Sequence, residues 1–152
     1  TPQAYYYWGP LGIMGEYAIS DAVARSGNKF VDLQNTAWNV SASWVLTGED
    51  AGYNGITPKK PFDLRKNQWG AFQLVARYGE LNVDDAVFSL YADPAKSASG
   101  AEVWSVGLNW YLNKNIRANA SFSRTVFDGH VTSGNVGYQP ENVLFSRVQL
   151  AF

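Results

Sequence analysis

Apolar and polar side chains alternate at every second residue through long stretches of this chain. In TAWNVSASWVL, residues 36–46, the large apolar side chains Trp38 and Trp44 fall on one face of an extended chain, and Asn39 and Ser41 fall on the other. Successive side chains of a β-strand point to opposite faces, whereas a helix would repeat every three or four residues. The pattern therefore predicts strands with one apolar face and one face of small polar residues.

Segments of this kind recur along the chain and are separated by clusters of Gly, Asn, Asp and Pro, which is typical of antiparallel strands joined by turns. No helix of useful length is indicated. We predict seven strands, at residues 3–8, 11–24, 36–47, 69–81, 102–112, 116–126 and 142–152.

The same alternation would suit a soluble β-sandwich or a lipocalin-like barrel, and three features favour a membrane barrel instead. The polar face carries mainly Ser, Asn, Ala, Gly and Gln rather than Lys and Glu. Trp38 and Trp44, and again Trp104 and Trp110, stand six residues apart on one apolar face, where two aromatic girdles would lie. A soluble sandwich seldom needs four Trp in its core. We therefore predict an all-β fold, a transmembrane antiparallel β-barrel.

Composition agrees with this prediction and limits the alternatives. Aromatic residues make up 15% of the 152 residues, and no apolar run approaches the ~20 residues of a membrane helix. The net charge of −1 argues against a nucleic-acid partner, which would require a basic surface. Cysteine is absent, and no signal-peptide pattern opens the sequence, so we expect any export signal to have been removed or to lie upstream.

Loop lengths give the expected orientation. A periplasmic C-terminus would place the short turn at residues 113–115 in the periplasm and the longer segments 25–35, 82–101 and 128–141 outside, as in known membrane barrels. The segment 86–92 could form a short strand, but we read it as loop structure. The connection at residues 48–68 is long yet falls on the periplasmic side by parity.

The last strand keeps its apolar face to the final residue, with Leu150 and Phe152 on the same side. This end resembles the terminal strand of bacterial outer-membrane porins, in which such a terminus is the signal read by the barrel-assembly machinery.

Several stretches together resemble the phosphate-selective porin O and P family. They are QAYYYWGPLGIMGEY, WNVSASWVLTGEDAGYNGITPKKPFD, WGAFQLVARYGELNVDD, YADPAKSAS, VGLNWYLNKNIRANASF and RVQLAF. The resemblance covers nearly the whole chain, and its most specific element is GLNWYLN followed by a basic strand.

The resemblance implies a sixteen-stranded, trimeric anion channel of the Gram-negative outer membrane, in contact with lipid and lipopolysaccharide. About seven strands would be supplied here, so residues 1–152 are expected to form the C-terminal portion of a single barrel domain. The family's phosphate selectivity depends largely on an earlier part of the barrel and is not carried over. An eight-stranded closed barrel is the competing architecture. It is disfavoured because seven is an odd number and small side chains would leave voids in a narrow barrel.

By parity, Arg77, Arg117 and Arg147 face the lumen, and Glu16 is the one acidic residue expected there. Fixed positive charge in a narrow passage favours anions, although these arginines could instead brace the wall by pairing with carboxylates. Arg124 has apolar-face parity near the outer rim, where it would reach toward lipid phosphates. The basic residues of the 48–68 connection, Lys59, Lys60, Arg65 and Lys66, are expected to be solvated.

Other chemistry has little support in the sequence. The single His130 lacks a nucleophile motif or a metal-ligand partner, and Asp84, Asp85 and Asp93 show no calcium-loop signature. We expect no enzyme activity, no cofactor and no metal. Two functions remain: a porin for passive diffusion of anions such as phosphate or polyphosphate, or a structural barrel that anchors an outer-membrane complex and conducts little.

Overall fold

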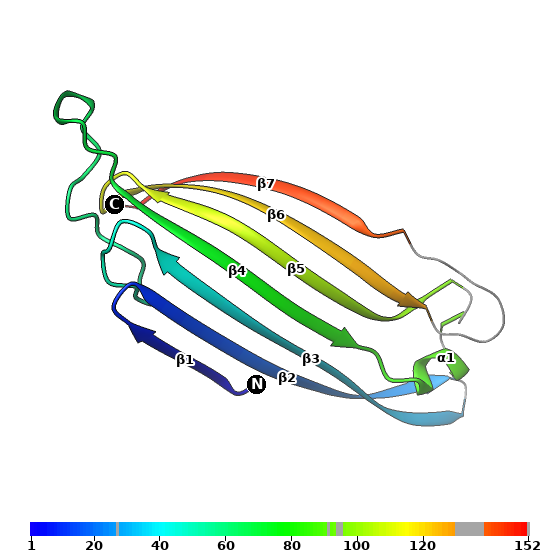
Figure 1. Ribbon diagram of the computed structural model, residues 1–152. Helices are drawn as coiled ribbons and strands as arrows, with labels where there is room; N and C mark the ends of the chain where they lie inside the picture. The colour runs from blue at the N-terminus through cyan, green and yellow to red at the C-terminus, as the bar shows by residue number, and fades with distance from the viewer. Residues whose placement is uncertain (27, 91, 94–95, 130–138, 152) are drawn as a thin grey trace.

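The computed structural model describes the chain except for residues 27, 91, 94–95, 130–138 and 152. The described residues form one seven-stranded antiparallel sheet in which each strand pairs with the next along the chain (Figure 1). The strands are β1 (Gln3–Trp8), β2 (Leu11–Ser26), β3 (Lys29–Val45), β4 (Ala71–Asn82), β5 (Ala98–Tyr111), β6 (Ile116–Gly129) and β7 (Glu141–Leu150). The prediction of seven antiparallel strands is confirmed. This all-β architecture is consistent with a fragment of a porin barrel.

The two faces of the sheet differ as the alternation predicts. In β5 the even-numbered residues from Glu102 to Leu108 are exposed, whereas the odd-numbered residues from Ala101 to Asn109 are partly covered. We call these the apolar face and the polar face. A soluble protein covers most of its large apolar side chains, so the exposure of the apolar face in this sheet is the opposite of the soluble pattern. Trp38, Trp44 and Trp104 are 36%, 52% and 42% exposed, so these rings are not packed together in a core.

The β2–β3 hairpin is longer than predicted. The segment 25–35 was expected to be an external loop, and this was wrong, because the ladder continues to the pair Ser26 and Lys29. Polar side chains bridge the extension, as when the Gln34 amide donates to Asp21 Oδ1 at 2.8 Å. A strand of about ten residues crosses a bilayer, so the rest of this 16-residue and 17-residue pair would project beyond it. In the part of the hairpin that projects beyond lipid, neither face has to be apolar, so the sequence there does not alternate between apolar and polar residues.

The loop expected at residues 82–101 is shorter in the structure, because β5 begins at Ala98. It contains a helix, α1 (Ala86–Leu90). Asp84 fastens this segment to β3: its carboxylate accepts the Gln34 N–H at 2.8 Å, and its own N–H donates to Asn35 Oδ1 at 3.0 Å. Because the backbone N–H groups of Gln34 and Ala86 donate to it, the pKa of Asp84 lies below its ordinary value. Most of the predicted loop 128–141 lies outside the described residues, and β6 extends to Gly129.

The connection between β3 and β4, residues 46–70, folds back onto the polar face at one end of the sheet. Its Ile56 packs with Val45, Ala71 and Tyr111 in the buried hydrophobic cluster of the described chain. The Ala51 N–H donates to the Gly9 carbonyl and the Phe62 N–H to the Leu112 carbonyl, both at 2.7 Å. The connection thus lies at the same end as the two short turns (Figure 1), in agreement with parity.

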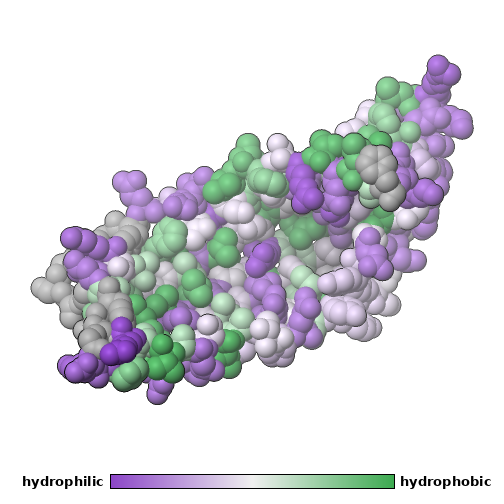
Figure 2. Space-filling model, turned by 180° about the vertical axis from the view of Figure 1, so that it is seen from behind, coloured by the Kyte–Doolittle hydropathy of each residue, from purple (hydrophilic) through white to green (hydrophobic). Residues whose placement is uncertain are grey.

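The return of the connection into β4 depends on Gly70. This residue has φ +75°, and a Cβ atom there would lie 2.2 Å from the Tyr111 carbonyl oxygen. Only glycine fits that position. Beyond the sheet, Figure 2 shows hydrophilic side chains at the tip of the projecting connection, near the short 3-10 helix Leu64–Lys66.

No helix in the described part of the chain has the length and apolar character needed to span a membrane.

Candidate functional site

The three arginines singled out from the sequence all lie on the polar face. Arg77 pairs in register with Ser41 of β3, Arg117 with Gln149 of β7, and Arg147 with Asn119 of β6. Arg117 and Arg147 lie on the adjacent strands β6 and β7, whereas Arg77 lies apart from them on β4. This is the face on which the parity argument placed them.

An amide network that the sequence analysis missed lies beside these arginines. The Asn119 side chain donates to Asn109 Oδ1 at 2.8 Å, and the Asn109 side chain donates to Gln73 Oε1 at 3.0 Å. The Tyr111 hydroxyl donates to the same Gln73 oxygen, also at 3.0 Å. The network ties β4, β5 and β6 together across the polar face. Its signal in the sequence is Asn or Gln at polar-face positions of three consecutive strands.

Arg117 is held in place by two neighbours. Its Nη2 donates to Gln149 Oε1 at 2.6 Å, and its guanidinium carbon lies 5.7 Å from the centre of the Tyr111 ring. A guanidinium has five N–H donors, and these contacts occupy few of them. Arg117 and Arg147 line one recess together with Asn109, Asn119, Phe145 and Gln149. The recess therefore offers two cations and several amide groups to a small polar solute.

Within the described chain, Arg77, Arg117 and Arg147 form no salt bridge with a carboxylate, and the ion pairs Lys66–Asp63 and Lys96–Asp93 lie elsewhere. Glu16 lies on the polar face as predicted and accepts a hydrogen bond from the Asn39 amide at 3.4 Å. Glu141, at the start of β7, shares the parity of Arg147, so this face carries a second carboxylate that was not expected. The three arginines still outnumber these two carboxylates on the polar face.

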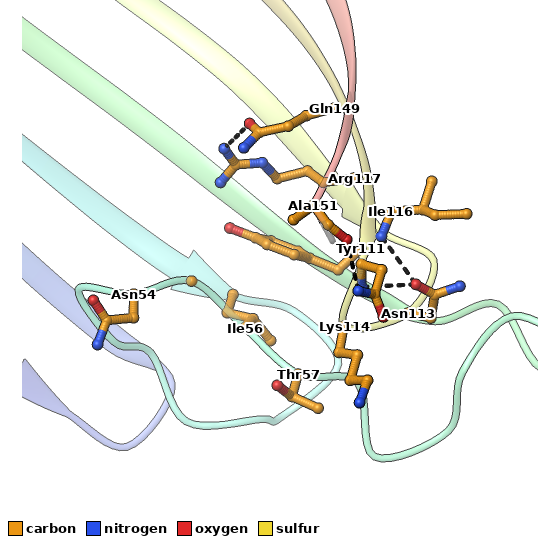
Figure 3. A pocket seen from close by; sticks show the side chains of 12 residues that line it. Asn54, Ile56, Thr57, Tyr111, Asn113, Lys114, Ile116, Arg117, Gln149 and Ala151 are labelled. Atoms are coloured by element: carbon orange, nitrogen blue, oxygen red, sulfur yellow. Dashed lines mark hydrogen bonds between the residues drawn. The ribbon is translucent and has the colours of Figure 1, made fainter.

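A second recess lies where the connection meets the sheet, and we call it the mouth pocket. Figure 3 shows Arg117 and Gln149 above Tyr111, with Ile56 and Thr57 of the connection opposite. Lys114 adds a second cation. Nearby, the Asn115 side chain donates to the Ala151 carbonyl at 2.6 Å, and the Ala151 N–H donates to the Asn115 carbonyl at 2.9 Å. These bonds secure the end of β7, where Leu150 is the last strand residue and Phe152 lies outside the described residues.

The four tryptophans of the predicted girdles all lie on the apolar face. Trp38 contacts the Tyr78 ring and Trp104 contacts the Phe122 ring, with centroids 5.5 and 5.4 Å apart. At the end nearer the connection, Trp110 stacks on Phe72 and donates from Nε1 to the Trp69 carbonyl at 2.6 Å. Phe62 of the connection packs edge-on against Trp110. Phe62, Trp69 and Phe72 thus extend the aromatic group beyond the residues singled out from sequence.

The remaining sequence candidates fall elsewhere. Arg124 lies on the apolar face opposite Trp104, and His130 lies outside the described residues. Among the described residues no group of three His, Cys, Asp or Glu could hold a metal ion. Lys59 is not simply solvated: its Nζ donates to the Gly48 carbonyl at 2.8 Å and its N–H to Glu49 Oε1 at 3.1 Å.

Comparison with known proteins agrees with this geometry. The profile of the family described as "Phosphate-selective porin O and P" matches residues 3–152. Porin O of Pseudomonas aeruginosa is 26% identical over 150 residues, which cover 95% of this chain and 33% of that protein. The chain therefore spans about a third of the length of the curated relative that it matches.

Proposed function

Because this chain belongs to the phosphate-selective porin O and P family, a family of outer-membrane proteins, we propose that it forms part of a water-filled channel for passive diffusion of anions. A porin is a channel rather than an enzyme. In this proposal residues 1–152 are the C-terminal portion of a sixteen-stranded barrel that assembles as a homotrimer. The apolar face contacts lipid and the polar face lines the lumen.

The observation that carries the proposal is the set of Arg77, Arg117 and Arg147 on the polar face, none of which forms a salt bridge within the described chain, although Glu16 lines the same recess as Arg77. Fixed cations in a confined passage concentrate anions and repel cations. The Coulomb energy of two charges about 4 Å apart rises from about 1 kcal/mol in water to about 4 kcal/mol near a protein surface. Phosphate is the solute that the family description names, and polyphosphate, a chain of the same anionic groups, would meet the same cations.

The apolar face has a matching role in the proposal. Trp38 and Trp104 would sit at the outer interface, and Trp44 and Trp110 at the periplasmic interface, because indole rings favour the boundary between lipid and water. Arg124 would reach phosphates of lipopolysaccharide in the outer leaflet. Leu150 and Phe152 would form the signal for the barrel-assembly machinery.

The test is reversal potential in a planar bilayer with a KCl gradient. We expect wild-type channels to prefer chloride, and the Arg117→Gln, Arg147→Gln double variant to lose several-fold in its anion-to-cation permeability ratio. Arg124→Gln is the matched control, because it removes the same charge from the opposite face of β6 and should leave the ratio unchanged. A cation preference in the wild type would refute the proposal. Absence of conductance from folded protein would instead favour the structural, anchoring role.

A further inference from the structure

Three tyrosines form a cluster on the polar face, where the connection meets β1. Tyr5 and Tyr7 of β1 have ring centroids 5.8 Å apart, and Tyr53 of the connection lies 5.4 Å from Tyr5. We call Tyr5, Tyr7 and Tyr53 the tyrosine cluster. Tyr7 pairs in register with Gly12, and a Cβ atom on Gly12 would lie 2.7 Å from the Tyr7 ring. The Tyr7 ring therefore lies flat over the glycine, against the surface of the sheet.

The other two rings of the cluster are open to the polar side. Tyr5 is 59% exposed and Tyr53 is 63% exposed, although each contacts a neighbouring ring. Exposed rings with polar hydroxyl groups offer flat surfaces on which sugar or base rings can stack. Stacking on such a ring tolerates any nucleobase, because every base has a π-face.

One tight turn joins this cluster to the cationic mouth pocket. The Gly55 N–H donates to the Gly52 carbonyl at 3.2 Å, which makes Tyr53 and Asn54 the central residues of the turn. Tyr53 contacts Tyr5, whereas Asn54 and Gly55 line the mouth pocket with Lys114 and Arg117. Tyr53 and Asn54 are consecutive residues, so the turn carries a ring of the tyrosine cluster directly next to a lining residue of the mouth pocket.

We propose that the tyrosine cluster and the mouth pocket together bind organic phosphate esters that carry a ring, such as nucleotides. The ring would stack on Tyr5 and Tyr53, and the phosphate would face Arg117 and Lys114. This inference deepens the proposed anion channel and rests on it. It predicts a preference that inorganic phosphate, which has no ring, cannot show.

The experiment measures block of single-channel chloride current by added solute. Three probes separate the two halves of the site: AMP carries ring and phosphate, inorganic phosphate lacks the ring, and adenosine lacks the charge. We expect AMP to block wild-type channels at a concentration at least about fivefold lower than either other probe, which is the lower range for one stacked base. The Tyr5→Ala, Tyr53→Ala double variant should lose this advantage.

Tyr6→Ala is the matched control, because Tyr6 is a neighbouring tyrosine, 67% exposed, on the opposite face of β1. It should leave AMP block unchanged. The inference is overturned if AMP and phosphate block equally in the wild type, or if the double variant keeps the difference, as it would if another part of the protein covers these rings. Either result leaves the chloride preference intact. Absence of anion preference altogether would overturn the proposed function instead.

Discussion

Glu49 is a charged side chain that the connection covers almost completely, at 5% exposure. Burial by itself raises the pKa of a carboxyl group, but the Thr47 hydroxyl and the Lys59 N–H both donate to Glu49. With the nearby Lys59 charge, these donors bring the pKa below the ordinary 4.5. The folded connection therefore favours the ionised form of this group.

A carboxyl group whose pKa is lowered by folding adds stability above its ordinary pKa and loses it as pH falls through the folded value. We expect Glu49→Gln to lower the free energy of unfolding at pH 7, and we expect the gap from wild type to narrow as the pH falls below 4.5. Urea unfolding in detergent at a series of pH values measures both effects. Asp50→Asn, at the exposed neighbouring carboxylate, is the control. A gap that stayed constant at all pH values would contradict this explanation.

Gly70 and Gly9 offer a second matched pair at this scale. Both have positive φ, +75° and +52°, but only Gly70 faces a carbonyl oxygen, whereas a Cβ on Gly9 would have no neighbour within 4 Å. We expect Gly9→Ala to cost about 1 kcal/mol of backbone strain and Gly70→Ala to cost more, because Tyr111 must also move. Heat-modifiable migration on gels, which separates folded from unfolded barrels, gives the midpoint of each variant. Equal midpoints would contradict the clash.

At the scale of the strand, neighbouring residues should respond oppositely to charge. Val106 is 45% exposed on the apolar face, and Ser105 faces the polar side, where its hydroxyl bonds Ser123 at 2.8 Å. An arginine facing lipid near the bilayer midplane costs about 2–4 kcal/mol, whereas a polar-face arginine remains in water. We therefore expect Val106→Arg to destabilise the protein by an amount in this range and Ser105→Arg by much less. Denaturant titration of the protein folded in liposomes measures the difference, and equal losses would be inconsistent with a lipid-facing Val106.

The strands were predictable because every second side chain of a membrane-spanning strand faces lipid and must be apolar, which produces a two-residue alternation in the sequence. This alternation predicted seven strands and the faces of Arg77 and Trp104. It failed for segment 25–35, where the extended hairpin has polar residues on both faces. Nor could it reveal the fold of the connection, since contacts such as Ile56 with Tyr111 join residues far apart in sequence. The amide network was missed for a related reason, because its members are ordinary polar-face residues until the register brings them together.

At the scale of the whole molecule, the proposed channel requires that the apolar face contacts lipid and the polar face contacts water. This assignment of lipid to one face and water to the other underlies the roles proposed for the aromatic residues, the arginines and the connection. The 152 residues contain no cysteine, so single cysteines can be introduced as labelling sites without removing any, and the solvent at each face can be measured directly.

The most direct measurement is a nitroxide scan of β3 in lipid bilayers, with cysteine placed in turn at Val40, Ser41, Ala42 and Ser43. Oxygen, which concentrates in lipid, and a water-soluble nickel complex serve as the two relaxing agents. We predict that oxygen relaxes the labels at Val40 and Ala42 more strongly, and that the nickel complex relaxes those at Ser41 and Ser43 more strongly. The opposite alternation, or none, would contradict the account.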